Sequence, residues 1–249
     1  MNFTQYFESF DRLGLILPEE IQGKIKTLKM AVADLNQGMY PKNPLPYLPL
    51  VESEISELIF GNLTVNDLTA KISELDHLLI DFRTVVRENL GLYCILNEVL
   101  LNDLVNFVNG PVLELAAGNG FLAARLASHG LQVTAVDNLS YASETENLNE
   151  YLPVVNADAK SYLARHLNDF ASIILAWSPD QDNFDLEILR LIRTSKPQVN
   201  FFVIGEHNGK TNSDEFWSEV HFINLKKMIR LNKRFSDFDL YHDRIYMVE

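Results

Sequence analysis

The sequence predicts an α/β protein in which an all-helical N-terminal segment precedes a doubly wound, mostly parallel sheet. Apolar residues recur at helical spacing before residue 110, whereas short apolar strands alternate with helices after it. Near the C-terminus, two strand-like runs without a convincing helix between them favour an antiparallel hairpin at one sheet edge. With 249 residues, 47% of them apolar and 22% charged, the chain is long enough for one core-forming domain and a smaller helical region.

Two apolar stripes predict long helices in the first part of the chain. One stripe runs from Ile21 to Leu35. The other runs from Leu68 to Val86, follows a candidate cap at Thr64 or Asn66, and ends at Gly91, a residue type that favours helix termination. Such stripes are more typical of core packing than of a cofactor channel, so we interpret them as structural.

A third helix is expected from about Leu92 to Phe107. Between the first two helices, residues 40–49 contain four prolines, which exclude a helix and predict an extended connector. We therefore divide the chain into a helical region, residues 1–90 with the Pro-rich connector 40–49, and an α/β domain, residues 91–249.

The α/β domain alternates between strands and helices, which is typical of a parallel sheet covered on both faces. The expected parallel strands are Pro111–Leu115, Gln132–Val136, Tyr151–Ala157, Ala171–Trp177 and Val199–Gly205. The expected helices are Phe121–His129, Lys160–Leu167 and Leu186–Arg193, and the two tail strands are Leu225–Leu231 and Asp243–Val248.

The net charge of −13 argues against a nucleic-acid partner, because nucleic acids bind basic surfaces. The negative charge is spread over the chain: residues 1–109 contain 8 basic and 15 acidic residues, and residues 110–249 contain 13 and 19. One basic cluster occurs at residues 226–234. At strand spacing it is more typical of a solvated edge that discourages aggregation than of a phosphate-binding site.

No apolar run is long enough to cross a bilayer, and the first residues lack the basic and apolar regions of a secretory signal. We therefore expect a cytoplasmic protein with no membrane partner. The single cysteine, Cys94, is placed in an apolar helix and cannot form an internal disulfide. The six histidines show no paired ligand spacing, so no metal site is expected.

A glycine-rich turn follows the first predicted strand. Gly118 and Gly120 allow the backbone to turn tightly and approach a ligand, and the next helix presents free amides there. Together with Ala123 they also satisfy the dinucleotide pattern Gly-x-Gly-x-x-Ala, so the turn alone does not identify the ligand. Glu114 separates the two ligand classes, because its carboxylate would repel a pyrophosphate and attract an ammonium or sulfonium cation.

Carboxylates also follow the next two strands. Asp137 ends the second strand, where an acidic side chain can accept hydrogen bonds from ribose hydroxyls. Asp158 follows the third strand, where it can accept a hydrogen bond from an adenine amino group. Acidic groups after three successive strands fit a cationic adenosine ligand better than a diphosphate.

The motifs Glu114-Leu-Ala-Ala-Gly118-Asn-Gly120, Asp137 and Asp158-Ala159 resemble, in order, those of class I S-adenosylmethionine (SAM)-dependent methyltransferases. The resemblance covers roughly residues 91–249. It implies a seven-stranded Rossmann-like methyltransferase sheet with an antiparallel C-terminal hairpin. The chain departs from the family pattern at residue 116, where alanine replaces the usual glycine and slightly narrows the turn.

The resemblance also implies a role for individual residues. Glu114 would lie near the methionine ammonium, and the two glycines under the methionine part. Asp137 would bind the ribose hydroxyls, and Asp158 with its neighbour would bind the adenine. The residues expected to contact the cofactor are Glu114, Ala116, Gly118, Asn119, Gly120, Asp137, Asn138, Asp158, Ala159, Trp177 and Tyr93, and no residue is assigned a catalytic role.

The end of the fourth strand, Trp177-Ser-Pro-Asp180, is similar to the position where amino-methylating family members carry Asn-Pro-Pro-Tyr. It lacks the terminal aromatic residue, so methylation of adenine or cytosine is not expected. A group of uncharacterised bacterial methyltransferase-like proteins carries Trp-Pro-Pro here and a second element that Gly205–Trp217 resembles. In that element, Glu206 and His207 are either a general base or, more simply, a solvated turn.

The resemblance therefore implies a SAM-dependent methyltransferase that acts on an unidentified small-molecule acceptor, with residues 1–90 as a cap that selects it. Two alternatives stay open. One is a non-catalytic SAM-binding protein, since the chain departs from the family pattern after the first and fourth strands. The other is an NAD-dependent oxidoreductase, against which Glu114 argues.

Overall fold

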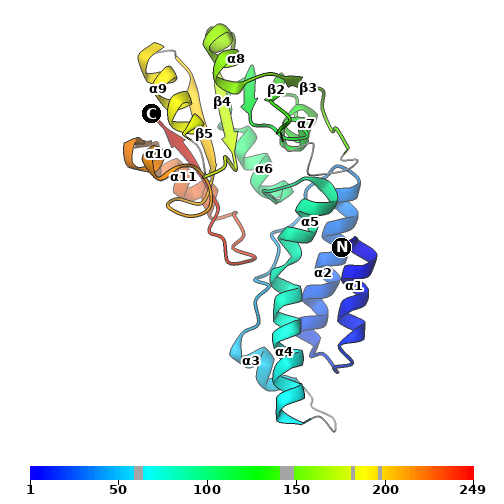
Figure 1. The fold of residues 1–249 in the computed structure, drawn as a ribbon. Coiled ribbons are helices and arrows are strands. Elements are labelled where there is room, and N and C mark those ends of the chain that lie inside the picture. Colours follow the sequence, from blue (N-terminus) through cyan, green and yellow to red (C-terminus); the bar gives the residue numbers. More distant parts are fainter. Residues whose placement is uncertain (59–63, 141–148, 181–182, 196–197) are drawn as a thin grey trace.

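The computed structural model describes residues 1–58, 64–140, 149–180, 183–195 and 198–249 (Figure 1). In these residues, seven strands form one sheet in the order β3-β2-β1-β4-β5-β7-β6. Strands β1 to β5 pair in parallel, whereas β7 runs antiparallel to β5 and to β6. The predicted fold class is thus confirmed. The strands are β1 (Val112–Leu115), β2 (Val133–Asp137), β3 (Val154–Asn156), β4 (Ser172–Ala176), β5 (Asn200–Gly205), β6 (Phe222–Ile223) and β7 (Arg244–Val248).

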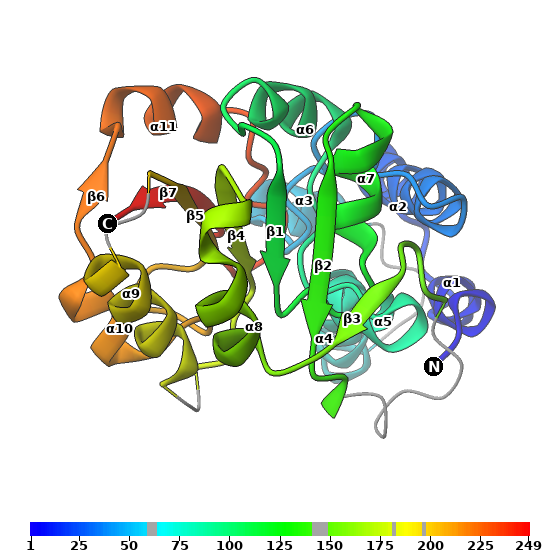
Figure 2. The same cartoon turned by 90° about the horizontal axis from the view of Figure 1, so that it is seen from above.

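Helices cover both faces of the sheet: α8, α9 and α10 lie on one face, and α6, α7 and α11 on the other (Figure 2). The alternation of side chains along each strand produces these layers, since Ile173 and Leu175 pack into the first and Ile174 into the second. The helices are α6 (Glu98–Val105), α7 (Phe121–Ser128), α8 (Ala159–His166), the 3₁₀ helix η2 (Leu167–Asp169), α9 (Phe184–Ser195), α10 (Asp214–Glu219) and α11 (Leu225–Asn232).

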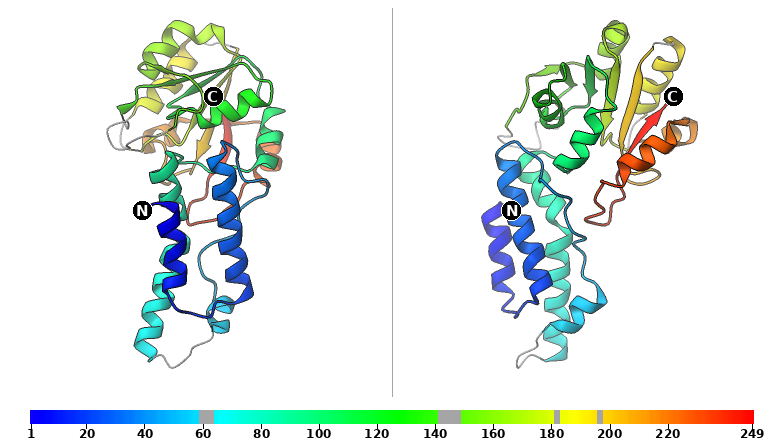
Figure 3. Two further views of the ribbon diagram at one scale, coloured as in Figure 1. Left: turned by 90° about the vertical axis from the view of Figure 1, so that its right-hand side faces the viewer. Right: turned by 180° about the vertical axis from the view of Figure 1, so that it is seen from behind.

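The N-terminal helices extend away from the carboxyl ends of the parallel strands (Figures 1 and 3). Their apolar faces form one core with the α6–α7–α11 side of the sheet, because Leu28 and Phe82 belong to the same buried cluster as Phe121 and Ile174. The helices are α1 (Phe3–Arg12), α2 (Glu19–Asn36), α3 (Glu52–Glu57), α4 (Val65–Ile80) and α5 (Phe82–Leu90). Among the described residues, no helix is both long and apolar enough to span a bilayer.

Local sequence signals fix several helix ends. Thr64 caps α4 by accepting a hydrogen bond from the Asp67 amide, and Gly91 ends α5 in the left-handed conformation with φ of 68°. The expected helix from Leu92 to Phe107 is wrong in its first half. Asn97 caps α6 by accepting the Leu100 amide at 2.9 Å, so residues 91–97 form an irregular segment, and Cys94 lies in that segment.

Two further predictions of local structure are wrong. The stripe from Leu68 to Val86 is not one helix, because the chain divides at Asp81 into α4 and α5. The strand expected at Leu225–Leu231 is helix α11, whose sequence is rich in helix-forming leucine, lysine, methionine and arginine. The buried side chains Met228 and Leu231, three residues apart, anchor α11.

Because α11 is a helix, the basic cluster at residues 226–234 does not line a sheet edge. Its members project from the exposed side of α11 and from the turn after it, and the strand at that sheet edge is β6. The antiparallel pair at the C-terminus is nevertheless present, with β6 in the place of the expected strand.

Arg83 on α5 joins the helical region to the end of the chain. Its buried guanidinium donates to both carboxylate oxygens of Asp239 and pairs with Asp243 at 2.9 Å. It also donates to the backbone carbonyl of Tyr93 at 2.9 Å and stacks over the Trp177 ring, with Cζ 4.6 Å from the ring centroid. One cation thus holds α5, the segment after it, the end of β4 and the loop before β7.

The substitution Arg83→Met should lower the free energy of unfolding by about 3 kcal/mol, because it leaves two buried carboxylates without their cation. Arg87→Met, one turn further along the exposed face of α5, is the matched control and should change it by less than about 0.5 kcal/mol. Urea denaturation of both variants provides the measurement. Equal effects of the two substitutions would show that the buried pairing does not hold the parts together.

Candidate functional site

A pocket of about 390 Å³ opens where the strand order reverses, between β1 and β4. In doubly wound sheets, ligands bind outside the carboxyl ends of the strands at this reversal. The pocket is lined by Tyr40, Gly91, Leu92, Tyr93, Cys94, Glu114, Ala116, Ala117, Gly118, Asn119, Phe121, Leu122, Asp137, Asn138, Ser140, Asp158, Ala159, Ala176, Trp177, Pro179 and Phe184. This set contains ten of the eleven residues expected from the sequence, all except Gly120.

The turn after β1 repeatedly adopts the left-handed conformation. Ala116, Gly118 and Gly120 have φ of 52°, 56° and 76°. A side chain at Gly118 would meet no atom within 4 Å, so this glycine faces open space in the pocket. A Cβ at Gly120 would approach the Leu152 carbonyl oxygen to 2.9 Å. Gly120 is therefore required by backbone packing, whereas Gly118 leaves room for a ligand.

Glu114 is the most unusual group in the pocket. Its side chain is only 3% exposed, and its Oε2 has no hydrogen-bond partner among the described residues. Burial raises the pKa of the Glu114 carboxyl to about 8, and the nearby Asp137 adds to the effect. The carboxyl accepts the Ala123 amide, which opposes the shift, but its other oxygen is left without a partner. Because such a buried oxygen is costly, its presence in a pocket favours a ligand that supplies a cation or a donor.

Asp137 at the end of β2 is tied to two turns. Its carboxylate accepts the Gly118 amide at 2.8 Å and the Leu139 amide at 2.6 Å. Burial raises the pKa of the Asp137 carboxyl, although these two amides oppose the shift. Each carboxylate oxygen has a second lone pair, so the group can still accept hydrogen bonds from ligand hydroxyls.

Three other lining residues have local structural tasks. Asn119 donates to the Leu90 carbonyl at 2.7 Å and so ties the glycine turn to the end of α5. Asn138 accepts the Ser140 amide at 3.0 Å. Asp158 caps α8 by accepting the Ser161 amide at 2.8 Å, and the hydrogen bond from the Ser161 hydroxyl, followed by this amide bond, lowers the pKa of its carboxyl. Asp158 is exposed, so it could accept a hydrogen bond from an adenine amino group and still cap the helix.

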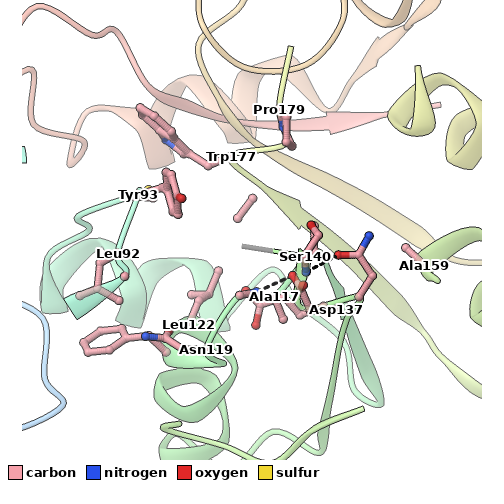
Figure 4. A pocket seen from close by; sticks show the side chains of 18 of the residues that line it. Leu92, Tyr93, Ala117, Asn119, Leu122, Asp137, Ser140, Ala159, Trp177 and Pro179 are labelled. Carbon is pink, nitrogen blue, oxygen red and sulfur yellow. Dashed lines mark hydrogen bonds between the residues drawn. The ribbon is translucent and has the colours of Figure 1, made fainter. Parts of the chain in front are cut away.

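Tyr93, Trp177 and Pro179 stand across the cavity from Ala117, Asp137 and Ser140 (Figure 4). Trp177 has a φ of 54°, which is strained for a bulky residue, and its backbone amide donates to the Ile204 carbonyl at 2.7 Å. Its Nε1 is buried without a hydrogen-bond partner in the described part of the chain. Tyr93, also on this side, is 40% exposed.

Sequence reasoning missed several lining residues, among them Ser140, Tyr40 and Cys94. Tyr40, from the Pro-rich connector, is buried and packs edge-on against Phe121 at 4.9 Å between ring centroids. Cys94 faces the pocket because residues 91–97 are irregular, and burial raises the pKa of its thiol. The density of prolines around Tyr40 and the strong Asn97 cap signal are the sequence features that could have indicated these last two residues.

Glu206 and His207 do not line the pocket. Glu206 accepts hydrogen bonds from the amides of Lys210 and His242, at 3.1 and 3.0 Å, and so stabilises the turn that follows it. His207 packs against Trp217 with 4.9 Å between ring centroids. The described residues contain no group of three or more histidine, cysteine, aspartate or glutamate side chains that could hold a metal ion.

The sequence matches no protein-family model and no curated protein. Three of the solved structures that it resembles are described as methyltransferases. They are the CcbJ methyltransferase from Streptomyces caelestis (19% identity over 43% of this chain and 51% of that chain, TM-score 0.30), a SAM-dependent methyltransferase from Archaeoglobus fulgidus (16%, 60% and 91%, TM-score 0.37) and magnesium protoporphyrin IX methyltransferase (ChlM) from Synechocystis PCC 6803 with bound S-adenosylhomocysteine (14%, 76% and 89%, TM-score 0.37).

The chain spans about half the length of the first of these proteins, 51%. Similarity to solved structures at such low sequence identity informs only about the fold. The strand order and the reversed β7 give the chain a methyltransferase-like Rossmann fold. What the pocket binds has to be argued from its own residues.

The substitution Ala116→Gly should raise the free energy of unfolding by about 1 kcal/mol, because glycine adopts the left-handed conformation without strain. Thermal denaturation measures the change. The adjacent Ala117→Gly is the control: Ala117 has no positive φ and is buried, so its substitution should instead destabilise by about 1 kcal/mol. A loss of stability in both variants would contradict strain at Ala116.

Proposed function

We propose that this chain binds SAM in the pocket between β1 and β4 and transfers its methyl group to a small-molecule acceptor. The observation that carries the proposal is the buried carboxyl of Glu114, with an unpartnered oxygen beside a glycine turn. A phosphate-bearing cofactor would gain no ionic partner from this group, whereas the ammonium of SAM would pair with its ionised form. The same argument weighs against an NAD-dependent oxidoreductase.

The lining fits the remaining parts of SAM. The open space at Gly118 accepts the methionine part, and Asp137 has lone pairs left for the ribose hydroxyls. Asp158 and Ala159 lie where the adenine would extend. When bound, SAM supplies a methyl group on a sulfonium, and this group is electrophilic enough to react without a metal. The chain's own residues then have to hold the acceptor in line and exclude water.

We further propose that residues 1–90, with the Pro-rich connector 40–49, form a cap that selects the acceptor, and that residues 91–249 bind the cofactor. Tyr40 contributes to the pocket from the connector, and α5 delivers the segment from Gly91 to Cys94. The connector is held in place where the Leu48 amide donates to the Phe238 carbonyl at 2.7 Å. Variable elements placed over an open sheet in this way commonly determine specificity.

Calorimetric titration with SAM, S-adenosylhomocysteine and NAD tests the proposal. The two adenosyl ligands should bind with micromolar affinity, and NAD should not bind. Gly118→Val should abolish binding because its side chain enters the open space, whereas Gly130→Val is the matched control. Gly130 also has a positive φ, 86°, and a Cβ there would meet no atom within 4 Å, so its substitution carries the backbone strain without touching the pocket.

Absence of binding by both adenosyl ligands would refute the cofactor assignment. Binding without turnover of any acceptor would favour the non-catalytic alternative.

The raised pKa of Glu114 predicts that binding is linked to proton release. With a pKa of about 8, this carboxyl is mostly protonated at neutral pH and has to ionise to pair with the ammonium. About 0.9 proton should therefore be released per molecule bound at pH ~7, and affinity should rise by about tenfold per pH unit from about pH 6 to 7.5. Titrations in buffers of different ionisation enthalpy measure the released proton.

Glu114→Gln keeps the shape of the protonated carboxyl, so the variant should fold and should lose both the proton release and most of the affinity. Its stability supplies a second check. Because the folded-state pKa lies above the unfolded one, wild-type stability should fall as pH rises from about 4.5 to 8. The variant should lack this part of the pH dependence. Retention of full affinity by the variant would remove Glu114 from the binding site.

A further inference from the structure

The pocket carries only negative formal charges. Its lining contains three carboxyls, Glu114, Asp137 and Asp158, and no lysine, arginine or histidine among the described residues. The sequence extends this asymmetry, since no basic residue occurs between His129 and Lys160, the segment that contains β2, β3 and the links after them. None occurs between His166 and Arg190 either, the segment that contains β4.

The cations nearest to the pocket are neutralised or lie outside it. Arg125 pairs with Glu98 at 3.0 Å. Arg83 faces two carboxylates, Asp239 and Asp243, so this cluster behind Trp177 has a net negative charge when both are ionised. Burial raises the pKa of Asp243 to about 6, which leaves it mostly ionised at neutral pH.

Lys160, next to the lining residue Ala159, pairs with Glu187 at 3.0 Å and does not itself line the pocket. Arg87 is another nearby cation. It is exposed, its Cζ lies 6.0 Å from the Tyr93 ring centroid, and it does not line the pocket.

The side of the pocket formed by Tyr93, Trp177 and Pro179, here called the acceptor side, lies across the cavity from Asp137 (Figure 4). Aromatic rings attract cations through the negative charge of their faces. This environment already holds one cation in that way, because the guanidinium of Arg83 lies 4.6 Å from the Trp177 ring centroid and 5.0 Å from that of Tyr241. An ammonium group would find ring faces on this side and carboxylates elsewhere in the lining, whereas a carboxylate or phosphate would find no cationic side chain among the described lining residues.

We propose that the acceptor is an organic amine that is positively charged at neutral pH, and that molecules carrying a carboxylate or phosphate at the acceptor side are rejected. This inference rests on the proposed function and concerns the class of acceptor, not the atom that receives the methyl group. Bound SAM has one net positive charge, so three ionised carboxylates leave the loaded pocket negative. The carboxylates therefore still favour a cation over an anion of the same shape.

Three probes of matched shape test the proposal on the full chain saturated with S-adenosylhomocysteine: 2-phenylethylamine, 2-phenylethanol and 3-phenylpropionate. Calorimetry or ligand-observed NMR measures their affinities. The amine should bind at least about tenfold more tightly than the carboxylate, with the alcohol between them, and the preference should weaken with added salt. Equal affinities, tighter binding of the carboxylate, or no binding of any probe would overturn the inference.

Pro179→Lys places a cation at the acceptor side without removing any residue assigned to the cofactor. Pro179 is exposed, so the variant should fold, and Pro179→Gln controls for the loss of the proline ring. The ratio of amine to carboxylate affinity should fall about fivefold in the lysine variant and stay unchanged in the glutamine variant. An unchanged ratio in the lysine variant would also overturn the inference.

The two proposals fail separately. Loss of S-adenosylhomocysteine binding would refute the proposed function. Normal binding of that ligand with no preference for the amine would refute only the acceptor class.

Discussion

The pairing of Arg83 with Asp239 and Asp243 holds together the parts of the chain that enclose the pocket. A buried guanidinium is stable only when its donors are satisfied, and here the acceptors come from the loop before β7 and from the Tyr93 carbonyl. The cation also lies against the Trp177 ring at the end of β4. Because all of these groups contact the same guanidinium, the loop before β7 helps to position both the segment after α5 and the Trp177 ring that lines the pocket.

The carboxyl ends of three neighbouring strands leave the sheet through left-handed turns at residues other than glycine. Ala116 follows β1, Leu139 follows β2 and Trp177 follows β4, with φ between 52° and 55°. Residues of each of these turns line the pocket: Ala116 after β1, Asn138 and Ser140 after β2, and Trp177 and Pro179 after β4. Strain of this kind persists when the surrounding structure fixes it, and it gathers at sites that bind ligands. In this chain the surrounding structure includes the amides held by Asp137 and the bond from Trp177 to β5.

Charge in the pocket opposes stability and favours binding. Glu114 lies on the strand face opposite the buried Leu113 and Leu115, in surroundings that favour its neutral form. A cation on a ligand would instead favour the ionised form of Glu114. The carboxyl that lowers the stability of the protein at high pH would therefore contribute to binding such a ligand. Because the described lining contains no basic side chain, its carboxylates would also attract a positively charged acceptor.

The sequence by itself determined the succession of strands and helices, the glycine turn and the acidic residues after β1, β2 and β3. These features depend on local signals: period, helix caps and residues that follow a strand. Even Asp158, singled out for a ligand, has a local role as the cap of α8.

Only the tertiary structure decided that residues 225–232 are a helix, that Cys94 and Tyr40 face the pocket, and that Arg83 meets Asp239, 156 residues away. The pairing of Arg83 with Asp239 depends on a contact between distant segments, which no local pattern contains. The helix-forming residues of α11 and the cap at Asn97 are local signals, but only packing shows which side chains they bury or turn toward the pocket.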